Sequence, residues 1–347
     1  MVPFKQGART MVEMRGSELI FRFPQVHEDA VCRVSFQRTL RIPDDNRSYP
    51  LPPGLGRFPL EHVQMHSPRL PAAWSKHGGV LLPMYQSEAM WINFDSETGG
   101  RHSQGYPFAI KVAAGKINAI SGEAWGDELV EHPQDYVVVP DQPWLDGFCI
   151  QKGLIRQFVA MPLGQGYSAE EQLTGEAVMG GLQIIVYPMK KDHYKKLLQK
   201  RESMKAPEIY CSMSVVQEPS MGLAPGGLMH QEIYEDRYGF DAWETGCSSR
   251  CFVHILNSEQ WAAAIGKPAP GQAPTAAEYT DAGLPWFEYY NDQIAHLPGA
   301  TSLAALDSVA AKGIKLGQTP LKENDPVTPG KVVGCGPKSD EVKDGTW

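Results

Sequence analysis

The fold class of this chain rests on the stretch Val31-Cys-Arg-Val-Ser-Phe-Gln-Arg-Thr-Leu-Arg-Ile42. Cys32, Val34 and Phe36 alternate with mostly polar neighbours, close to a period of two. This period places successive side chains on opposite faces of a β-strand. We therefore expect an antiparallel sheet with one face on the core and the other face in water.

Up to about residue 257 the chain consists of short apolar runs separated by turn residues. Its 34 glycines and 28 prolines fall between these runs and favour short strands over long helices. The fold class that follows is α+β, mainly β, with sandwich-like antiparallel sheets and a few helices. The runs that predict further strands are 80–84, 89–94, 108–113, 117–120, 136–139, 155–161, 182–187, 228–234 and 252–256.

The predicted organisation has two β-rich halves, a helical appendage and a tail. The halves can also be read as one large twisted sandwich, because their strand patterns do not differ. The Pro/Gly-rich excursion at 43–60 contains apolar side chains, which a flexible linker would not need, so we expect an ordered segment packed on the sheet. The parts are 1–150 with the excursion at 43–60, 151–257 with a helix at 189–205, 258–316 as the appendage, and 317–347 as an extended or disordered tail.

Composition argues against two classes of protein. The net charge of −8, without a basic stripe beyond the helix at 189–205, disfavours nucleic-acid binding, which needs clustered Lys and Arg. No apolar run approaches the roughly 20 residues of a transmembrane helix, and we see no secretory signal. Six scattered cysteines favour reduced thiols. We therefore expect a soluble cytoplasmic protein.

One run has the spacing of a metal site. His230 and Glu232 would point the same way from one strand, and His254 follows on the next predicted strand. If those strands are neighbours, two imidazoles and a carboxylate converge within reach of zinc or Fe(II). The alternative is that both histidines are ordinary sheet residues with satisfied ring nitrogens, and that Glu232 faces water or an arginine.

The segment Pro225-Gly-Gly-Leu-Met-His230 resembles a motif of the cupin superfamily, Pro-x-Gly-x-x-His, which precedes a metal-binding histidine on a barrel strand. The position two residues later, a histidine in that motif, is Glu232 here. The resemblance implies a metal-dependent enzyme with a site around His230, Glu232 and His254.

Tryptophans supply a second set of candidate residues. Four of them stand near Gly, Pro or acidic residues, where exposed rings form a protein interface or a sugar platform. Buried, the same rings would close the ends of the sheets. The four are Trp91, Trp144, Trp243 and Trp286.

The helix at 189–205 carries lysines around an apolar stripe that includes Tyr194 and Leu197. Such a helix can contact an anionic membrane or polymer, or it can simply present a solvated face beside a sheet. The sequence pattern leaves both alternatives open.

Three longer phrases resemble a family of uncharacterised proteins from bacteria and filamentous fungi, some of which are labelled integral membrane proteins. They are Tyr49-Pro-Leu-Pro-Pro-Gly-Leu-Gly-Arg-Phe-Pro-Leu60, Gln142-Pro-Trp-Leu-Asp-Gly147 and Gly283-Leu-Pro-Trp-Phe-Glu-Tyr-Tyr290. The resemblance implies no activity.

The leading functional hypothesis is a non-enzymatic binding or structural protein that needs no cofactor and forms a homo-oligomer through aromatic-rich loops. Its support is that no catalytic constellation is evident in the sequence. The alternatives are a zinc- or iron-dependent, cupin-like enzyme and a carbohydrate-binding module with a polysaccharide partner.

Overall fold

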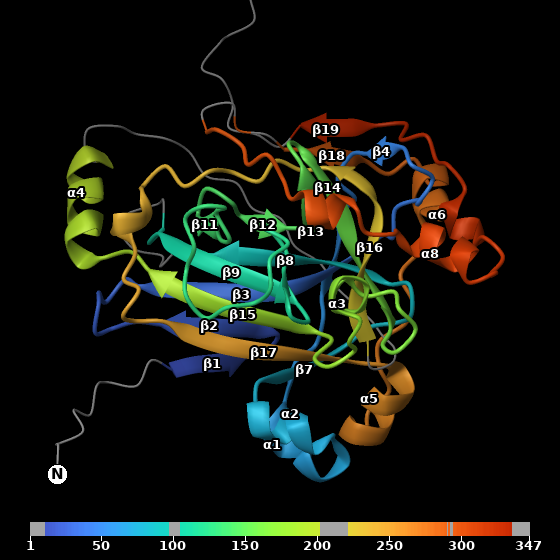
Figure 1. Ribbon diagram of the computed structural model, residues 1–347, viewed down its shortest axis with the longest axis horizontal. Coiled ribbons are helices and arrows are strands. Elements are labelled where there is room, and N and C mark those ends of the chain that lie inside the picture. The colour runs from blue at the N-terminus through green and yellow to red at the C-terminus, as the bar shows by residue number, and fades with distance from the viewer. Residues whose placement is uncertain (1–10, 97–104, 202–220, 290, 292–293, 335–347) are drawn as a thin grey trace, which may run out of the picture.

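The computed structural model describes residues 11–96, 105–201, 221–289, 291 and 294–334, and it consists mainly of two β-sheets (Figure 1). The fold is therefore mainly β within the α+β class, as the alternation predicts. The ten-stranded sheet has the order β1-β2-β3-β8-β14-β16-β4, with β5, β12 and β13 attached at its side. Its strands are β1 (Met11–Arg15), β2 (Glu18–Arg22), β3 (Val31–Thr39), β4 (Ser48–Tyr49), β5 (Gly54–Arg57), β8 (Ala89–Asp95), β12 (Trp144–Leu145), β13 (Gly147–Gln151), β14 (Leu154–Pro162) and β16 (Met221–His230).

The second large sheet has seven strands in the order β10-β9-β15-β17-β7-β6, with β11 beside β9. Every residue of β9 and β15 is buried, so these two strands are the interior of the sheet. The strands are β6 (Glu61–His62), β7 (Val80–Pro83), β9 (Phe108–Ala114), β10 (Ile117–Asn118), β11 (Val137–Val139), β15 (Leu182–Pro188) and β17 (Ser249–Leu256). A separate pair joins β18 (Trp286–Glu288) to β19 (Val332–Gly334) in parallel.

Both large sheets take strands from both sides of residue 150. In the first sheet β8 pairs with β14, and in the second β9 pairs with β15. One cluster of buried side chains joins the sheets, with Phe36 and Ile92 from one and Val112 and Ile184 from the other. The two predicted β-rich halves therefore share one sandwich and do not have separate cores.

β3 shows the predicted alternation but not the predicted wet face. Ser35 is 1% exposed and Gln37 is 2% exposed, although both lie opposite the core-facing side chains. The amide of Gln37 donates to the Ser35 hydroxyl at 3.0 Å. On the same strand the Thr39 hydroxyl donates to the Pro53 carbonyl at 2.8 Å, so the excursion at 43–60 lies against this part of the sheet. The expected contact of this face with water is wrong for Ser35 and Gln37.

Short helices surround the sandwich (Figure 1). α1, α2 and α5 form a lower lobe on β7 with a small apolar core of its own that includes Val63, Leu256 and Trp261. Among the described residues, no helix has both the length and the apolarity needed to cross a bilayer. The helices are α1 (Val63–His66), α2 (Ala72–His77), α3 (Ala169–Thr174), α4 (Lys191–Arg201), α5 (Ser258–Ile265), α6 (Ala276–Asp281), α7 (Thr301–Ala304) and α8 (Val309–Lys315), with 3₁₀ turns η1 (Ser67–Arg69), η2 (Phe240–Ala242) and η3 (Lys322–Asn324).

The C-terminal part of the chain is less uniformly helical than predicted. The appendage at 258–316 contains β18 as well as α5 to α8. The first part of the predicted tail carries η3 and β19, and residues 335–347 lie outside the described residues.

Candidate functional site

The predicted metal-binding residues lie on different sheets. His230 is the last residue of β16 in the ten-stranded sheet and is exposed, whereas His254 lies in β17 of the seven-stranded sheet and is 4% exposed. β16 approaches the other sheet at its first residue, where the Gly181 amide donates to the Met221 carbonyl at 3.3 Å. His230 lies at the far end of that strand, about 30 Å away at the usual rise per residue. The two imidazoles therefore do not converge.

His254 is packed against a tryptophan and hydrogen-bonded within the protein. Its ring stacks on Trp74 with centroids 4.5 Å apart, and Nε2 lies 3.0 Å from the Gly78 carbonyl oxygen. Burial disfavours the charged imidazolium and lowers the pKa of His254 to about 4. A neutral ring with this packing joins α2 to β17.

Glu232 pairs with a histidine that the sequence argument did not single out. The distance from His296 Nε2 to Glu232 Oε2 is 3.3 Å, and the Tyr234 hydroxyl donates to the same oxygen at 3.3 Å. The Tyr234 and His296 rings meet edge to face at 5.6 Å. Across the described ranges, no group of three or more His, Cys, Asp or Glu side chains is arranged to hold a metal ion.

Two of the four candidate tryptophans are fully buried. Trp243 donates its indole N–H to Asp236 at 2.7 Å, and Trp286 donates to the Thr280 hydroxyl at 3.2 Å. Buried indoles with satisfied N–H groups are core residues. Neither ring is available to a partner in this conformation, which corrects their assignment to a contact surface.

The other two tryptophans lie together and are partly exposed. Trp91 on β8 and Trp144 on β12 meet edge to face with centroids 6.1 Å apart. Trp144 also contacts Tyr289, just after β18, at 4.8 Å. We call Trp91, Trp144 and Tyr289 the aromatic surface.

The backbone of Trp144 is fixed by its neighbours. β12 pairs with β8 so that Trp144 lies opposite Asn93, and the Trp144 carbonyl accepts from the Gln142 amide at 3.0 Å. The other end of that amide accepts from the backbone N–H of Tyr234 at 3.2 Å. Gln142 therefore connects the aromatic surface to the Glu232–His296 pair.

A buried carboxyl lies two residues from Trp144. Asp146 is 3% exposed, and its carboxyl accepts from the Gln231 amide at 2.6 Å while its N–H donates to the same side chain at 3.0 Å. Burial raises the pKa of Asp146 to about 7. The carboxyl is screened from solvent and bonded within the protein, so we assign it a role in fixing this loop.

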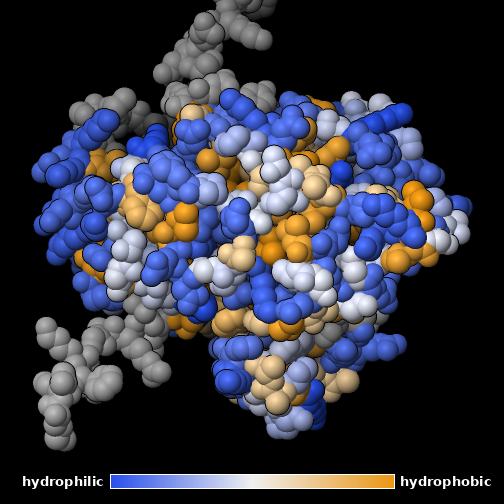
Figure 2. Space-filling view, viewed as in Figure 1, coloured by the Kyte–Doolittle hydropathy of each residue, from blue (hydrophilic) through white to orange (hydrophobic). Residues whose placement is uncertain are grey.

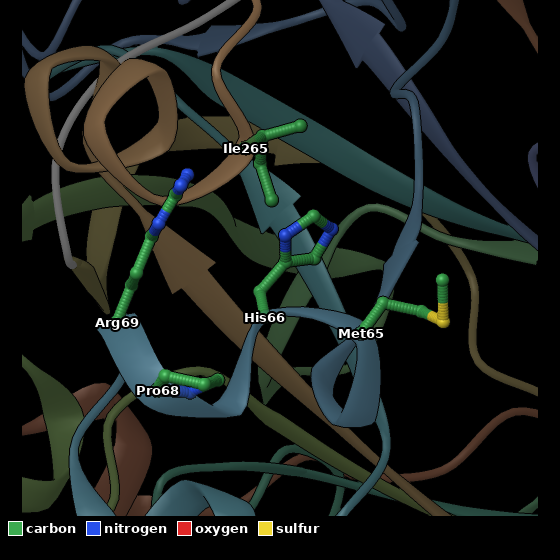
Figure 3. Close-up of a pocket in the computed structure, with 5 residues that line it drawn as sticks. All are labelled: Met65, His66, Pro68, Arg69 and Ile265. Carbon is green, nitrogen blue, oxygen red and sulfur yellow. The ribbon is translucent and has the colours of Figure 1, made fainter.

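A hollow of about 450 Å³ lies in the lower lobe, and Figure 3 shows the side chains that line it. Arg69 reaches α5 and donates to the Ala264 carbonyl at 3.1 Å. His66 Nε2 has no hydrogen-bond partner, and the Glu61 carboxylate is 3.5 Å away. The ionisable side chains of the lining are those of His66 and Arg69. The lining consists of Met65, His66, Pro68, Arg69 and Ile265.

Sequence reasoning missed the parts of the site that come from the C-terminal segment. Tyr289 and His296 fall in a region interpreted as a helical appendage, and neither has a spacing signal to Trp144 or Glu232. The aromatic run Trp286-Phe-Glu-Tyr289 was the one usable signal. Comparison of the chain with family models, curated proteins and solved structures gave no match.

Proposed function

We propose that this is a non-enzymatic binding protein that associates with a second copy of itself through the aromatic surface. The observation that carries the proposal is the contact of Trp91, Trp144 and Tyr289, three partly exposed rings from separate segments. Trp and Tyr are enriched at protein interfaces, where a few large rings supply most of the binding energy.

The surroundings of the rings fit a protein interface. Arg237 and Asp141 form an ion pair at 2.6 Å, with the Arg237 side chain 49% exposed. Asp141 is near enough to contribute to the raised pKa of Tyr289, after the larger effect of burial. An aromatic centre with a charged rim is the usual anatomy of an interface between proteins.

The fixed position of Trp144 also supports the proposal. Its strand pairing and the Gln142 hydrogen bond hold the residue in place before a partner arrives. A surface that is already ordered loses less conformational entropy on association. The second copy is favoured as partner because most soluble oligomers are symmetric homo-oligomers, in which one patch meets itself.

The test is sedimentation velocity over a range of protein concentrations, with Trp144→Ala beside the wild type. We expect a wild-type dimer and at least tenfold weaker association of the variant, since a central aromatic contributes about 2 kcal/mol or more. The matched control is Trp74→Ala, another partly exposed tryptophan, in the lower lobe. A strictly monomeric wild type, or equal effects of both substitutions in folded proteins, would overturn the proposal.

We propose the cytoplasm as the location. Four cysteines among the described residues, Cys32, Cys149, Cys247 and Cys251, form no disulfide. Free thiols persist in reducing compartments.

A further inference from the structure

The lysines of this acidic protein are concentrated on α4. Lys190 to Lys200 contains five lysines and a single acidic residue, whereas the whole chain has a net charge of −8. Lys191, Lys195 and Lys196 are exposed. α4 stands at the left end of the molecule in Figure 1, and Figure 2 shows a mostly hydrophilic surface there.

α4 is held by its apolar side, so the lysines stay in solvent. Tyr194 is 2% exposed, and its ring lies 4.2 Å from that of Tyr106 and 5.1 Å from that of His27. Leu197 and Leu198 pack against the main core beside it. The basic face is therefore displayed on a fixed helix.

A second surface has the opposite charge. Residues 123–131, which we call the acidic loop, contain Glu123, Asp127, Glu128 and Glu131 and no lysine or arginine. All four acidic residues are exposed. The loop lies between the strands β10 and β11, and one of its carboxylates, Asp127, pairs with Arg250 of β17.

The acidic loop is also held in place, by the buried side chain of Lys111. Lys111, buried in β9, donates to the Gly126 carbonyl at 2.9 Å and pairs with the Asp135 carboxylate at 2.6 Å. Its ammonium group lies 5.2 Å from the centre of the Trp125 ring. One buried cation therefore holds the middle of the loop and, through Asp135, the segment that follows it.

These charges have few partners within one copy. In the described part of the chain, Lys191 and Lys196 form no ion pair, and neither do Glu123 and Glu128. Lys195 pairs with Asp192 on its own helix, at 3.5 Å between two largely exposed side chains. Such exposed pairs are weak.

We propose that α4 of one copy docks on the acidic loop of a second copy. The two surfaces are complementary in charge and are held in place by Tyr194 and Lys111. Among the described residues each keeps two charged side chains that form no ion pair, namely Lys191 and Lys196 on α4 and Glu123 and Glu128 in the loop. A two-fold arrangement would form the contact twice, which is how a symmetric dimer uses two different patches. Charge complementarity of this kind sets orientation and accelerates association. This contact adds to the aromatic surface and is argued independently of it.

The test uses charge-reversed variants in sedimentation velocity. One variant carries Lys191→Glu, Lys195→Glu and Lys196→Glu, and the other carries Glu123→Lys, Glu128→Lys and Glu131→Lys. We expect each alone to associate about tenfold more weakly than wild type in about 0.02 M NaCl, and an equimolar mixture of the two to regain association. In about 0.5 M NaCl screening should reduce the difference from wild type.

The matched control carries Lys152→Glu, Lys322→Glu and Lys331→Glu, three exposed lysines away from α4, with the same change in net charge. The inference is overturned if this control weakens association as much as the α4 variant, or if the mixture does not recover. A wild type that dimerises and is insensitive to all charge reversals overturns this inference alone. A wild type that is monomeric in both salts overturns it together with the proposed function.

Discussion

Two regions of the molecule each place an ionisable group in the core beside a tryptophan, and they respond to pH in opposite ways. In the lower lobe His254 lies under Trp74, and near the aromatic surface Asp146 lies two residues from Trp144. Burial disfavours the charged form of both, which lowers the pKa of His254 to about 4 and raises the pKa of Asp146 to about 7. Above about pH 7 burial acts against the ionised carboxylate of Asp146, whereas the imidazole of His254 is neutral and is not destabilised in this way.

This difference in pKa predicts which region loses stability as the pH falls and which loses stability as the pH rises. An unfolded histidine takes up a proton below about pH 6.5, but folded His254 resists until about pH 4, so acid destabilises the lower lobe. An unfolded aspartate loses its proton above about pH 3.8, but folded Asp146 keeps it to about pH 7, so stability falls as the pH rises between these values.

The largest expected effect is that of Asp146→Asn near pH 8. The substitution removes a buried charge while keeping an acceptor for Gln231, so we expect a gain of up to about 4 kcal/mol in the free energy of unfolding. Near pH 4 the gain should vanish, because the carboxyl is then protonated. Urea denaturation at both values of pH measures it, and a gain that is independent of pH would contradict the account.

The substitution His254→Phe tests the lower lobe. We expect the wild type to lose about 3 kcal/mol of stability through this histidine between about pH 7 and pH 4, and the variant to lack that loss. Near pH 7 the variant should be about 1 kcal/mol less stable, since the Gly78 carbonyl loses its donor. Equal acid sensitivity of both proteins in urea denaturation would remove the contrast between the two regions.

A partly exposed pair sharpens the contrast. Glu232→Gln removes the carboxylate that lies 3.3 Å from His296 Nε2, and the Glu232 and His296 side chains are 22% and 17% exposed. Exposed and half-exposed pairs contribute about 0–1 kcal/mol, so the variant should unfold within about 1 kcal/mol of the wild type. A loss of several kcal/mol would place Glu232 among the buried ionisable groups.

The smallest effect is expected for His230→Ala. His230 is exposed at the end of β16, so its replacement should change the free energy of unfolding by no more than about 0.5 kcal/mol. Metal analysis of protein purified without chelator should give the same content for both proteins. Stoichiometric zinc or iron that disappears in the variant would restore the metal-enzyme hypothesis.

The strands with a clear period of two could be predicted from sequence, whereas β16 was predicted only at its end: the expected strand at 228–234 overlaps Leu228 to His230, and Met221 to Gly227 were not expected to be a strand. Its Pro225-Gly-Gly run has the composition of a turn but lies inside the strand. A β-carbon at Gly226 would come within 2.4 Å of Val159, and one at Gly227 within 2.4 Å of the Pro43 carbonyl oxygen. Glycine serves here to let chains approach closely, a tertiary cause that no local pattern reveals.

The candidate site was predictable only in part, because its contacts join distant segments. Trp91 and Trp144 were singled out, but their partner Tyr289 follows β18, which arrives from the C-terminal region. The failure of His230 and His254 to meet has the same origin. The spacing of residues places side chains on one face of a strand, but it does not say which sheet the strand joins.

The most direct test of self-association is hydrogen–deuterium exchange of the wild-type protein at low and high concentration. The account predicts slower exchange at high concentration around Trp91 and Trp144, in the acidic loop and along α4, with no change in the lower lobe. Exchange that is independent of concentration in all these segments would contradict it.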